Sequence, residues 1–353
     1  MAKKKKKSTG ARKTLIALCV VFGLILAVLV AGTVYAEYLL GKVNYVDSEA
    51  TIPTLSQEQI DALYQPDEGL EDETVPEETE PEVFETEPEE EVIHETLPTF
   101  KTSSENIKTF LLIGADNNKT TGISRTDSII LCTFNKTQKK ITLTSFLRDT
   151  YVSIPGYKKN RLNVPYTLGG LPLLLKTLEA NFGVVPDGTV IIDFDNFYRL
   201  IEYVGGIEIE LTAAEANYLN EIRKTKLKPG LQTLGGLQAL DYARCRELAS
   251  GDIARTNRQR IVLSTLLHKY KNLGKAELLG MMDDVLPMVS TDMSKEDILG
   301  YFLTFFPMLA EAELVSERIP IDNSYDLVMR EGMSVFIIDF AENKKALQEI
   351  MYE

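Results

Sequence analysis

The strongest constraint on this chain is an uncharged run near its N-terminus, TLIALCVVFGLILAVLVAGTVYA, at residues 14–36. A helix needs about 20 such residues to cross the hydrocarbon core of a bilayer. The basic residues before the run favour a cytoplasmic N-terminus. We therefore expect a single-pass cell-membrane protein with a cytoplasmic tail at residues 1–13 and everything after the span outside the cytoplasm. A cleaved signal peptide is the alternative, although its apolar core would be shorter, about 7–15 residues.

Residues 37–104 are predicted to form an extracytoplasmic linker. Between residues 47 and 98 the chain has no lysine or arginine and is rich in glutamate, proline and threonine. Such a segment buries too little apolar surface to offset its chain entropy, so we expect it to be disordered and extended. A short helix near residues 55–64 is the one exception that we expect. Since most of the acidic charge lies here, the remaining outer part is close to neutral.

Residues 105–353 have the pattern of a folded domain. Apolar runs predict strands at residues 108–116, 126–135 and 139–147, and the turn NKTQKK joins the last two as a hairpin. Helical patterns follow, including LPLLLKTLEANFG, which ends at a glycine, and MSKEDILGYFLTFFPMLA, in which Ser294 and Asp297 resemble a capping box. Strands interleaved with helices predict an α/β sandwich around one mixed sheet.

Histidine and cysteine are too scarce for several common kinds of active site. His94 lies in the linker and His268 on an apolar helix, which argues against a Ser-His-Asp triad or a histidine-based zinc site. There is no GKS/T phosphate-binding loop. Cys132 and Cys245 are far apart in the outer domain. We expect them to be buried free thiols, with one disulfide as the alternative.

Aspartate and arginine gather instead at the ends of three predicted strands. Asp116 ends the first strand, Arg125 and Asp127 share one face at the start of the second, and Arg148 is followed by Asp149 at the end of the third. Carboxylates hold Mg²⁺ through few contacts, and guanidinium groups match phosphate bidentately. A turn cap or a surface ion pair would explain any single one of these residues. Their repetition at three strand ends predicts a site for phosphate and a divalent metal.

The stretch GDIARTNRQR predicts a basic helix with Asp252 as its N-cap. At 100° per residue, Arg255, Arg258 and Gln259 fall on one face, whereas Arg260 points elsewhere. A basic patch is often a nucleic-acid footprint, and a solvated helix face is the other explanation. Because the predicted span places this helix outside the cytoplasm, we expect no nucleic-acid partner.

For a second group of basic residues, the sequence does not decide in which direction the side chains point. In YARCRE, Arg244 and Arg246 would point the same way along an extended backbone, about 7 Å apart, but would diverge on a helix. The helical pattern of LGGLQALDYAR reaches about Tyr242, so the sequence leaves both geometries open. Arg161 lies with two lysines after a Pro-Gly turn, where a solvated loop is the simpler explanation.

Taken in order, the motifs RTDS, LRDTY, RLN-x-x-Y-x-x-GG, FDNFYRLIEYVGGIEI, GLQALDYARCR and GDIARTNRQR resemble the LytR-CpsA-Psr family. The resemblance covers the chain from about residue 106 onward. It implies a three-layer α/β/α sandwich with a central mixed β-sheet, whose core groove holds a prenyl chain. It also implies a phosphotransferase of the Gram-positive cell envelope. Such an enzyme moves a glycopolymer (wall teichoic acid, capsule or another wall polysaccharide) from a polyprenyl-pyrophosphate carrier to a peptidoglycan sugar hydroxyl.

The resemblance also implies roles for individual residues. Asp116 and Asp127 correspond to the ligands of Mg²⁺, with Mn²⁺ as the alternative. The general base is left open between Asp252, Asp149 and a weakly assisted hydroxyl. The groups expected to bind pyrophosphate are Arg125, Arg148, Arg161, Arg244, Arg246, Arg255 and Gln259. Those expected to take part in catalysis are Arg125, Arg148, Asp252 and Arg255.

Three positions depart from the family's usual residues. Arg161 stands for a lysine, Leu147 for a proline and Arg260 for a glutamine. None of them removes a metal ligand or a core arginine, so we expect activity to be retained. Phosphoryl transfer needs positioning and charge neutralisation more than a covalent nucleophile, which agrees with the scarcity of histidine. The alternatives are a polyprenyl-pyrophosphate phosphohydrolase, a non-catalytic envelope regulator and a transcriptional attenuator.

Overall fold

The computed structural model describes residues 32–49, 56, 60, 63–64, 103–117, 124–246, 248, 251–271 and 275–352. The predicted tail, nearly all of the predicted span and most of the predicted linker, including most of its expected short helix, lie outside these residues. Among the helices that are described, none is long and apolar enough to cross a membrane.

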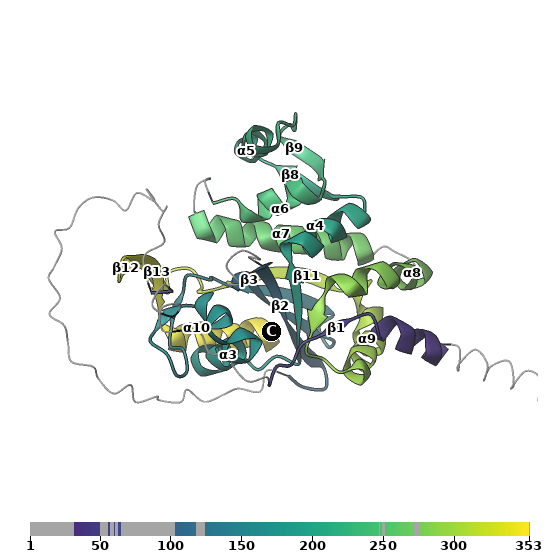
Figure 1. Cartoon of the computed structure of the whole chain (residues 1–353), viewed down its shortest axis with the longest axis horizontal. Helices are drawn as coiled ribbons and strands as arrows, with labels where there is room; N and C mark the ends of the chain where they lie inside the picture. Colours follow the sequence, from purple (N-terminus) through teal and green to yellow (C-terminus); the bar gives the residue numbers. More distant parts are fainter. Residues whose placement is uncertain are drawn as a thin grey trace, which may run out of the picture.

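A seven-stranded sheet forms the centre of the fold (Figure 1). Its strands are β1 (Asn44–Tyr45), β2 (Ile107–Asn117), β3 (Ser124–Asn135), β4 (Lys140–Phe146), β7 (Gly188–Asp193), β10 (Ser290–Thr291) and β11 (Glu313–Ile319). They are arranged in the order β1-β10-β7-β2-β3-β4-β11. β2, β3 and β4 are antiparallel neighbours, whereas β7 and β11 add parallel strands on either side. The predicted mixed sheet and its central hairpin are therefore confirmed.

Three short ribbons, the helical residues 32–40 and eight further α-helices complete the described part of the fold. The ribbons are β5 (Tyr151–Val152) with β6 (Asn160–Arg161), β8 (Ile207–Leu211) with β9 (Gly230–Leu234), and β12 (Tyr325–Arg330) with β13 (Met333–Ile338). The helices are α3 (Val164–Phe182), α4 (Phe194–Tyr203), α5 (Ala213–Arg223), α6 (Gly236–Arg244), α7 (Gly251–Lys271), α8 (Lys275–Val285), α9 (Lys295–Leu309) and α10 (Phe340–Tyr352), with a 3₁₀ turn at η1 (Leu286–Met288).

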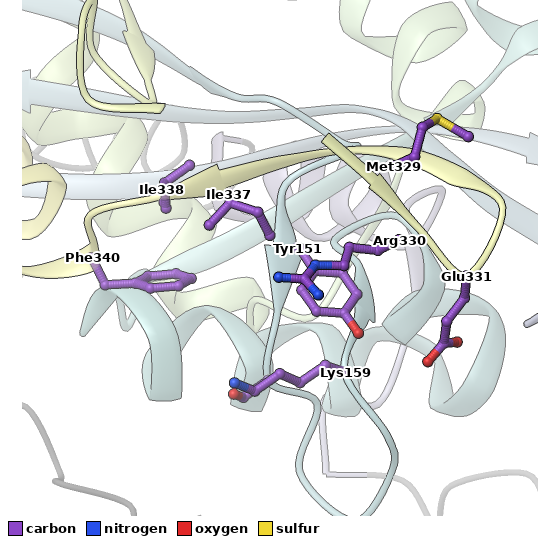
Figure 2. A pocket seen from close by; sticks show the side chains of 9 residues that line it. Tyr151, Lys159, Met329, Arg330, Glu331, Ile337, Ile338 and Phe340 are labelled. Carbon is purple, nitrogen blue, oxygen red and sulfur yellow. The ribbon is translucent and has the colours of Figure 1, made fainter. Parts of the chain in front are cut away.

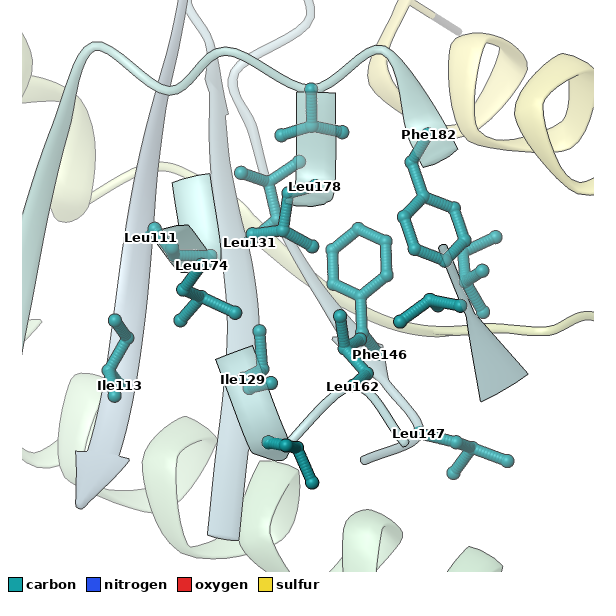
Figure 3. Packing of buried hydrophobic residues seen from close by; sticks show 14 of the residues in the cluster. Leu111, Ile113, Ile129, Leu131, Phe146, Leu147, Leu162, Leu174, Leu178 and Phe182 are labelled. Atoms are coloured by element: carbon teal, nitrogen blue, oxygen red, sulfur yellow. The ribbon is translucent and has the colours of Figure 1, made fainter. Parts of the chain in front are cut away.

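Period-two alternation along the central strands sends apolar side chains to both faces of the sheet. On one face, Leu111 and Leu131 pack with α3 and α10, as Figure 3 shows for α3 residues such as Leu178. On the other face, Ile130 and Cys132 pack against α9 and α7. Helices therefore cover both faces of the sheet. Cys132 and Cys245 are free and buried, as expected.

Helix α3 contains the predicted helical run and ends at Gly183, whose φ of 70° is the left-handed conformation that glycine favours at a helix end. Its Leu173, Leu174 and Leu178 are almost completely buried in the core between α3 and the sheet. The leucine run of this helix is thus explained by core packing. Helix α9 begins as predicted, with the Ser294 side chain accepting a hydrogen bond from the backbone N–H of Asp297.

A second, smaller core stands beyond the end of the sheet, where α4, α5, α6 and α7 gather around the β8–β9 ribbon (Figure 1). Two short pieces of the predicted linker also take part in the fold. Residues 44–45 form the edge strand β1, and Leu63 is buried in the main core. The carbonyl of Leu63 accepts a hydrogen bond from Asn160. Helix α7 connects the two cores, because Ile253 near its N-terminal end packs against the main core, whereas Val262 and Leu266 belong to the smaller one.

Candidate active site

A β-bulge places Asp127. The β2–β3 register slips by one residue there, which leaves Asp127 as the extra residue on β3. Bulges re-aim side chains and are frequent beside active sites. The carboxylate of Asp127 forms an ion pair with Arg148, and Nη2 of Arg246 lies 3.9 Å from it. Its backbone carbonyl accepts a hydrogen bond from Nε2 of Gln259 at 3.1 Å. Through Asp127 at the bulge, β3 therefore contacts Arg148 after β4, Arg246 after α6 and Gln259 on α7.

Arg148 follows β4 and is the centre of a charge cluster. Its Nε lies 3.4 Å from a carboxylate oxygen of Asp149 and 3.4 Å from one of Asp252, in addition to the pair with Asp127. Its side chain is only 8% exposed. Burial alone would lower the pKa of Arg148, but the three carboxylates outweigh it and raise the pKa. The guanidinium is therefore firmly charged.

The first turn of α7 supplies Asp252 and Arg255. The prediction that Asp252 is the N-cap is wrong, because the helix already includes Gly251. As a residue inside the first turn, Asp252 forms an ion pair with Arg255, three positions along the helix. Neither of its carboxylate oxygens accepts a hydrogen bond from a described residue. Asp252 thus neutralises arginines instead of capping the helix.

The geometry of Arg244 and Arg246 is settled by the end of α6. That helix stops at Arg244 and Cys245 is extended, so neither a continuous helix nor a continuous strand holds the two arginines, and their guanidinium groups have different partners. Arg246 approaches Asp127, whereas Cζ of Arg244 lies 4.5 Å from the centre of the Phe194 ring. From the other side, Arg161 on β6 places Nη1 3.7 Å from Asp149.

Four arginines therefore face three aspartates in this cluster, which leaves a positive surplus. Burial and the neighbouring Asp149 raise the pKa of Asp252 to about 6, while burial lowers the pKa of Arg255 to about 10. Burial would also raise the pKa of Asp127, but Arg148, Arg255 and Arg246 hold it below its usual value. Nε and Nη1 of Arg255 are buried and lack a hydrogen-bond partner among the described residues. Unsatisfied buried donors in a cationic cluster suit an anionic ligand.

An apolar cavity of about 230 Å³ opens beside the cluster, between the sheet and helices α4, α6 and α7. Asp127, Arg244 and Gln259 form its polar end. Its apolar walls include Leu112, Ile130, Val190, Ile192, Phe194, Phe197, Leu200, Val262, Leu263 and Leu266. The leucines of α3 lie on the opposite face of the sheet, so they pack in the main core and do not line this cavity.

Asp116 and Arg125 lie at the edge of the cluster. Asp116 on β2 is the register partner of Arg125 on β3, and Arg125 lies two residues before Asp127 on the same strand. Both side chains are half-buried. No group of three potential metal-ligating side chains occurs among the described residues. Asp116 and Asp127 thus offer two carboxylates, and a Mg²⁺ ion held by them would need its remaining ligands from water and phosphate.

The predicted stripe on α7 is only partly correct. Gln259 and Arg255 face the cluster, but Arg258 turns to the smaller core, where its Nε donates to Glu215 at 2.8 Å. Glu215, 43 positions away, had no signal in the sequence except its place in the capping box of α5. Arg260, whose separate direction was expected, is buried and donates one hydrogen bond to Asn257.

Comparisons with known proteins follow the same part of the chain. The sequence model of the LytR_cpsA_psr family matches residues 74–351. Regulatory protein MsrR of Staphylococcus aureus is 33% identical over 248 residues, which cover 69% of this chain and 74% of that protein. The polyisoprenyl-teichoic acid–peptidoglycan teichoic acid transferase TagU of Enterococcus faecalis is 33% identical over 275 residues, 73% of this chain and 84% of the relative.

Solved structures agree with these matches. The crystal structure of TagT from Bacillus subtilis superposes with a TM-score of 0.57 at 25% identity, over 70% of this chain and 91% of the other. TagT bound to LIIa-WTA gives the same TM-score at 26% identity, over 72% and 94% of the two chains. The mixed α/β fold is therefore shared with these proteins. With a family match over residues 74–351 and relatives at 33% identity, the chain belongs to the LytR_cpsA_psr family.

Proposed function

We propose that this protein is a phosphotransferase that moves a glycopolymer from a polyprenyl-pyrophosphate carrier to a sugar hydroxyl of peptidoglycan. One observation carries the proposal: the cationic cluster and the apolar cavity meet at Asp127, which pairs with Arg148 and Arg246, and at Gln259, which donates to the Asp127 carbonyl. A ligand with a diphosphate joined to a long hydrocarbon needs these two environments side by side. The names of TagT and TagU, which are teichoic acid transferases, support the same class of reaction.

Different residues would bind the two parts of the donor, its pyrophosphate and its prenyl chain. Arg148, Arg161, Arg246 and Arg255 surround the position proposed for the pyrophosphate, and their forked guanidinium groups match phosphate oxygens. The surplus positive charge of the cluster would help to neutralise the dianionic pyrophosphate of the donor when it binds. The cavity between α4, α6, α7 and the sheet takes the first part of the prenyl chain, with Arg244 held against Phe194 at its mouth. Wall teichoic acid or a capsular polysaccharide would be the transferred polymer.

The proposed transfer is a single displacement at phosphorus. The oxygen of the acceptor hydroxyl attacks the phosphorus next to the glycan, and the bond from that phosphorus to the bridging oxygen breaks. Polyprenyl phosphate leaves with the electron pair, and a phosphodiester links glycan and peptidoglycan. Asp252 takes the hydroxyl proton, because a carboxyl with a pKa of about 6 is mostly ionised at neutral pH yet remains basic. The arginines stabilise the negative charge that develops on the leaving phosphate.

We further propose Mg²⁺, with Mn²⁺ as a substitute, as the cofactor, held by Asp116 and Asp127. The ion would supply charge neutralisation on the phosphate oxygens. In the same proposal the protein is anchored in the cell membrane by residues 14–36. Its N-terminus is cytoplasmic and its catalytic domain extracytoplasmic. This orientation would place the catalytic domain on the outer side of the bilayer that holds the donor's prenyl chain.

The decisive experiment is a reconstituted transfer from a synthetic prenyl-pyrophosphate glycan to peptidoglycan oligomers. We expect the purified full chain to form the phosphodiester and Arg148→Ala to lower the rate by roughly 10³-fold, as the loss of a preorganised cation does. Thermal unfolding of the variant serves as the control for folding. Equal rates for wild type and Arg148→Ala would remove the site assignment. Release of polyprenyl phosphate without transfer, in the presence of acceptor, would instead indicate a phosphohydrolase.

A further inference from the structure

A second pocket, of about 590 Å³, lies under the β12–β13 hairpin and outside the cluster described above (Figure 2). Its size is within the range of small-molecule sites, about 300–1,000 Å³. In Figure 2 the side chains of Ile337 and Phe340 lie toward one end, whereas Arg330 and Glu331 lie around Tyr151 toward the other. The pocket therefore has an apolar, aromatic part and a charged part.

The hairpin holds the charged part in a defined position. β12 and β13 are joined by the two residues Glu331 and Gly332, with φ values of 52° and 78°. Two consecutive positive φ values are typical of the tight type I′ turn, which leaves a hairpin little freedom. Arg330 and Glu331 also act on the same group, because burial and Glu331 raise the pKa of Tyr151 while Arg330 opposes this. Strand β13 contacts β5, so the hairpin lies against the strand that carries Tyr151.

The backbone connects this pocket directly to the cluster. The N–H of Phe336 on β13 donates to the carbonyl of Asp149 at 3.0 Å. Tyr151, which lines the pocket, is two residues from Asp149, a distance of about 7 Å along an extended chain. Tyr151 is also the register partner of Arg161, whose guanidinium pairs with Asp149. The lining of the pocket is therefore joined through Tyr151 to the two cluster residues Asp149 and Arg161.

The chemistry of the lining favours an acidic saccharide. The rings of Tyr151 and Phe340 offer flat apolar surfaces that suit the face of a pyranose ring, and the hydroxyl of Tyr151 adds a polar atom at the edge of one of them. Lys159 and Arg330 outnumber Glu331, so the lining carries a net positive charge that suits a carboxylate. The proposed donor diphosphate already has its partners in the neighbouring cluster. The remaining substrate is the acceptor, and peptidoglycan carries carboxylates on its muramyl residues and peptides.

We propose that the pocket lined by Tyr151, Lys159, Arg330 and Phe340 binds the acceptor glycan by a sugar unit that bears a carboxylate. This inference rests on the proposed function, which supplies the identity of the acceptor. It adds the place where that acceptor binds and the groups that select it. The two substrates would then approach Asp149 and Arg161 from opposite sides, with the donor on the side of α7 and the acceptor on the side of the hairpin.

The test is a double variant, Lys159→Glu with Arg330→Glu, compared with the matched double variant Lys226→Glu with Lys228→Glu. Both change the net charge equally at exposed positions, and the control lies on the segment between α5 and β9. We expect the pocket variant to raise the KM for peptidoglycan oligomers by roughly 10-fold or more, the usual effect of losing charge-assisted contacts. The kcat at saturating acceptor and the KM for the donor should stay unchanged. A KM equal to that of the control, or a rise in the KM for the donor instead, would overturn the inference.

A binding measurement separates this inference from the proposed function. The probe is a soluble disaccharide of N-acetylglucosamine and N-acetylmuramic acid, with its methyl ester as the uncharged counterpart, titrated into the full chain in detergent. We expect the free acid to bind wild type and the Lys226/Lys228 control alike. Binding should be roughly 10-fold weaker for the ester or for the pocket variant. Absence of binding to wild type would overturn the inference even if transfer occurs. Binding without any transfer would count against the proposed function alone.

Discussion

Arg255 and Arg258 lie three residues apart on α7 and are both almost fully buried, at 2% and 6% exposure. The two guanidinium groups differ in how many of their nitrogens have partners within the fold. Arg258 donates to Glu215 at 2.8 Å and to the carbonyl of Cys245 at 3.1 Å, and it lies over the ring of Tyr242. Nη2 of Arg255 forms an ion pair with Asp252, whereas its buried Nε and Nη1 have no hydrogen-bond partner among the described residues.

This difference separates a structural arginine from a binding arginine. A buried charge is costly unless partners within the fold satisfy it. Arg258 has such partners, so the smaller core accounts for it completely. The donors of Arg255 remain unsatisfied in a cluster that already has a surplus of positive charge, and an anionic substrate would satisfy them. The same helix can thus hold the two cores together and present a cation to a ligand.

Replacing Arg255 with methionine should give the largest effect on activity. We expect transfer to fall by roughly 10³-fold, about 4 kcal/mol of transition-state stabilisation, because a preorganised cation is lost. The free energy of unfolding should change by less than about 1 kcal/mol, since the residue removed is an incompletely satisfied buried charge. Single-turnover transfer and urea unfolding measure the two quantities. A large loss of stability would mean that Arg255 is structural like Arg258.

Replacing Arg258 with methionine should give the converse result. We expect the free energy of unfolding to fall by about 3 kcal/mol, because Glu215 is left buried without its main partner. Transfer per folded molecule, measured well below the unfolding temperature, should remain within about threefold of wild type. The double variant with Glu215→Gln should recover part of the stability. If Arg258→Met instead stopped transfer in a stable protein, the comparison between the two arginines would fail.

Much of this architecture follows from local sequence pattern. Apolar runs along β2, β3 and β4 predicted the sheet, because strands that pack against helices on both faces are apolar on both sides. Asp127 and Arg148 were predicted to meet, because neighbouring strands bring their ends together. Glycine at Gly183 and serine at Ser294 marked helix ends through their backbone chemistry.

The features that the sequence did not predict depend on distant neighbours. The direction of Arg258 is decided by Glu215, and the split of Arg244 from Arg246 by where α6 ends. The bulge at Asp127 arises from a one-residue slip that no residue type in RTDS requires. Likewise, whether an apolar stretch lines a cavity or a core depends on which face of the sheet it covers. The leucine run on α3 showed this.

The carboxylates that accompany the two arginines provide the last and smallest predicted effect. Burial and Asp149 raise the pKa of Asp252 from 3.8 to about 6. For Glu215, burial acts in the same direction, but hydrogen bonds from the Thr212 backbone and from Arg258 outweigh it and lower the pKa. The two groups should therefore affect stability with opposite signs as the pH changes.

For Asp252, the unfolded chain ionises before the folded one, so stability falls as pH rises from about 4 to 6 and then levels off. Asp252→Asn should therefore raise the free energy of unfolding by about 2 kcal/mol at pH 7.5 and leave it unchanged near pH 4. Glu215→Gln should lower it at pH 7.5, with the loss disappearing as the pH falls through the lowered pKa of Glu215. If Asp252 also accepts the proton, wild-type kcat should fall below about pH 6 and Asp252→Asn should lose roughly 10²-fold in rate. A kcat that stays flat from pH 5 to 8 in the wild type would leave Asp252 only the role of neutralising Arg255.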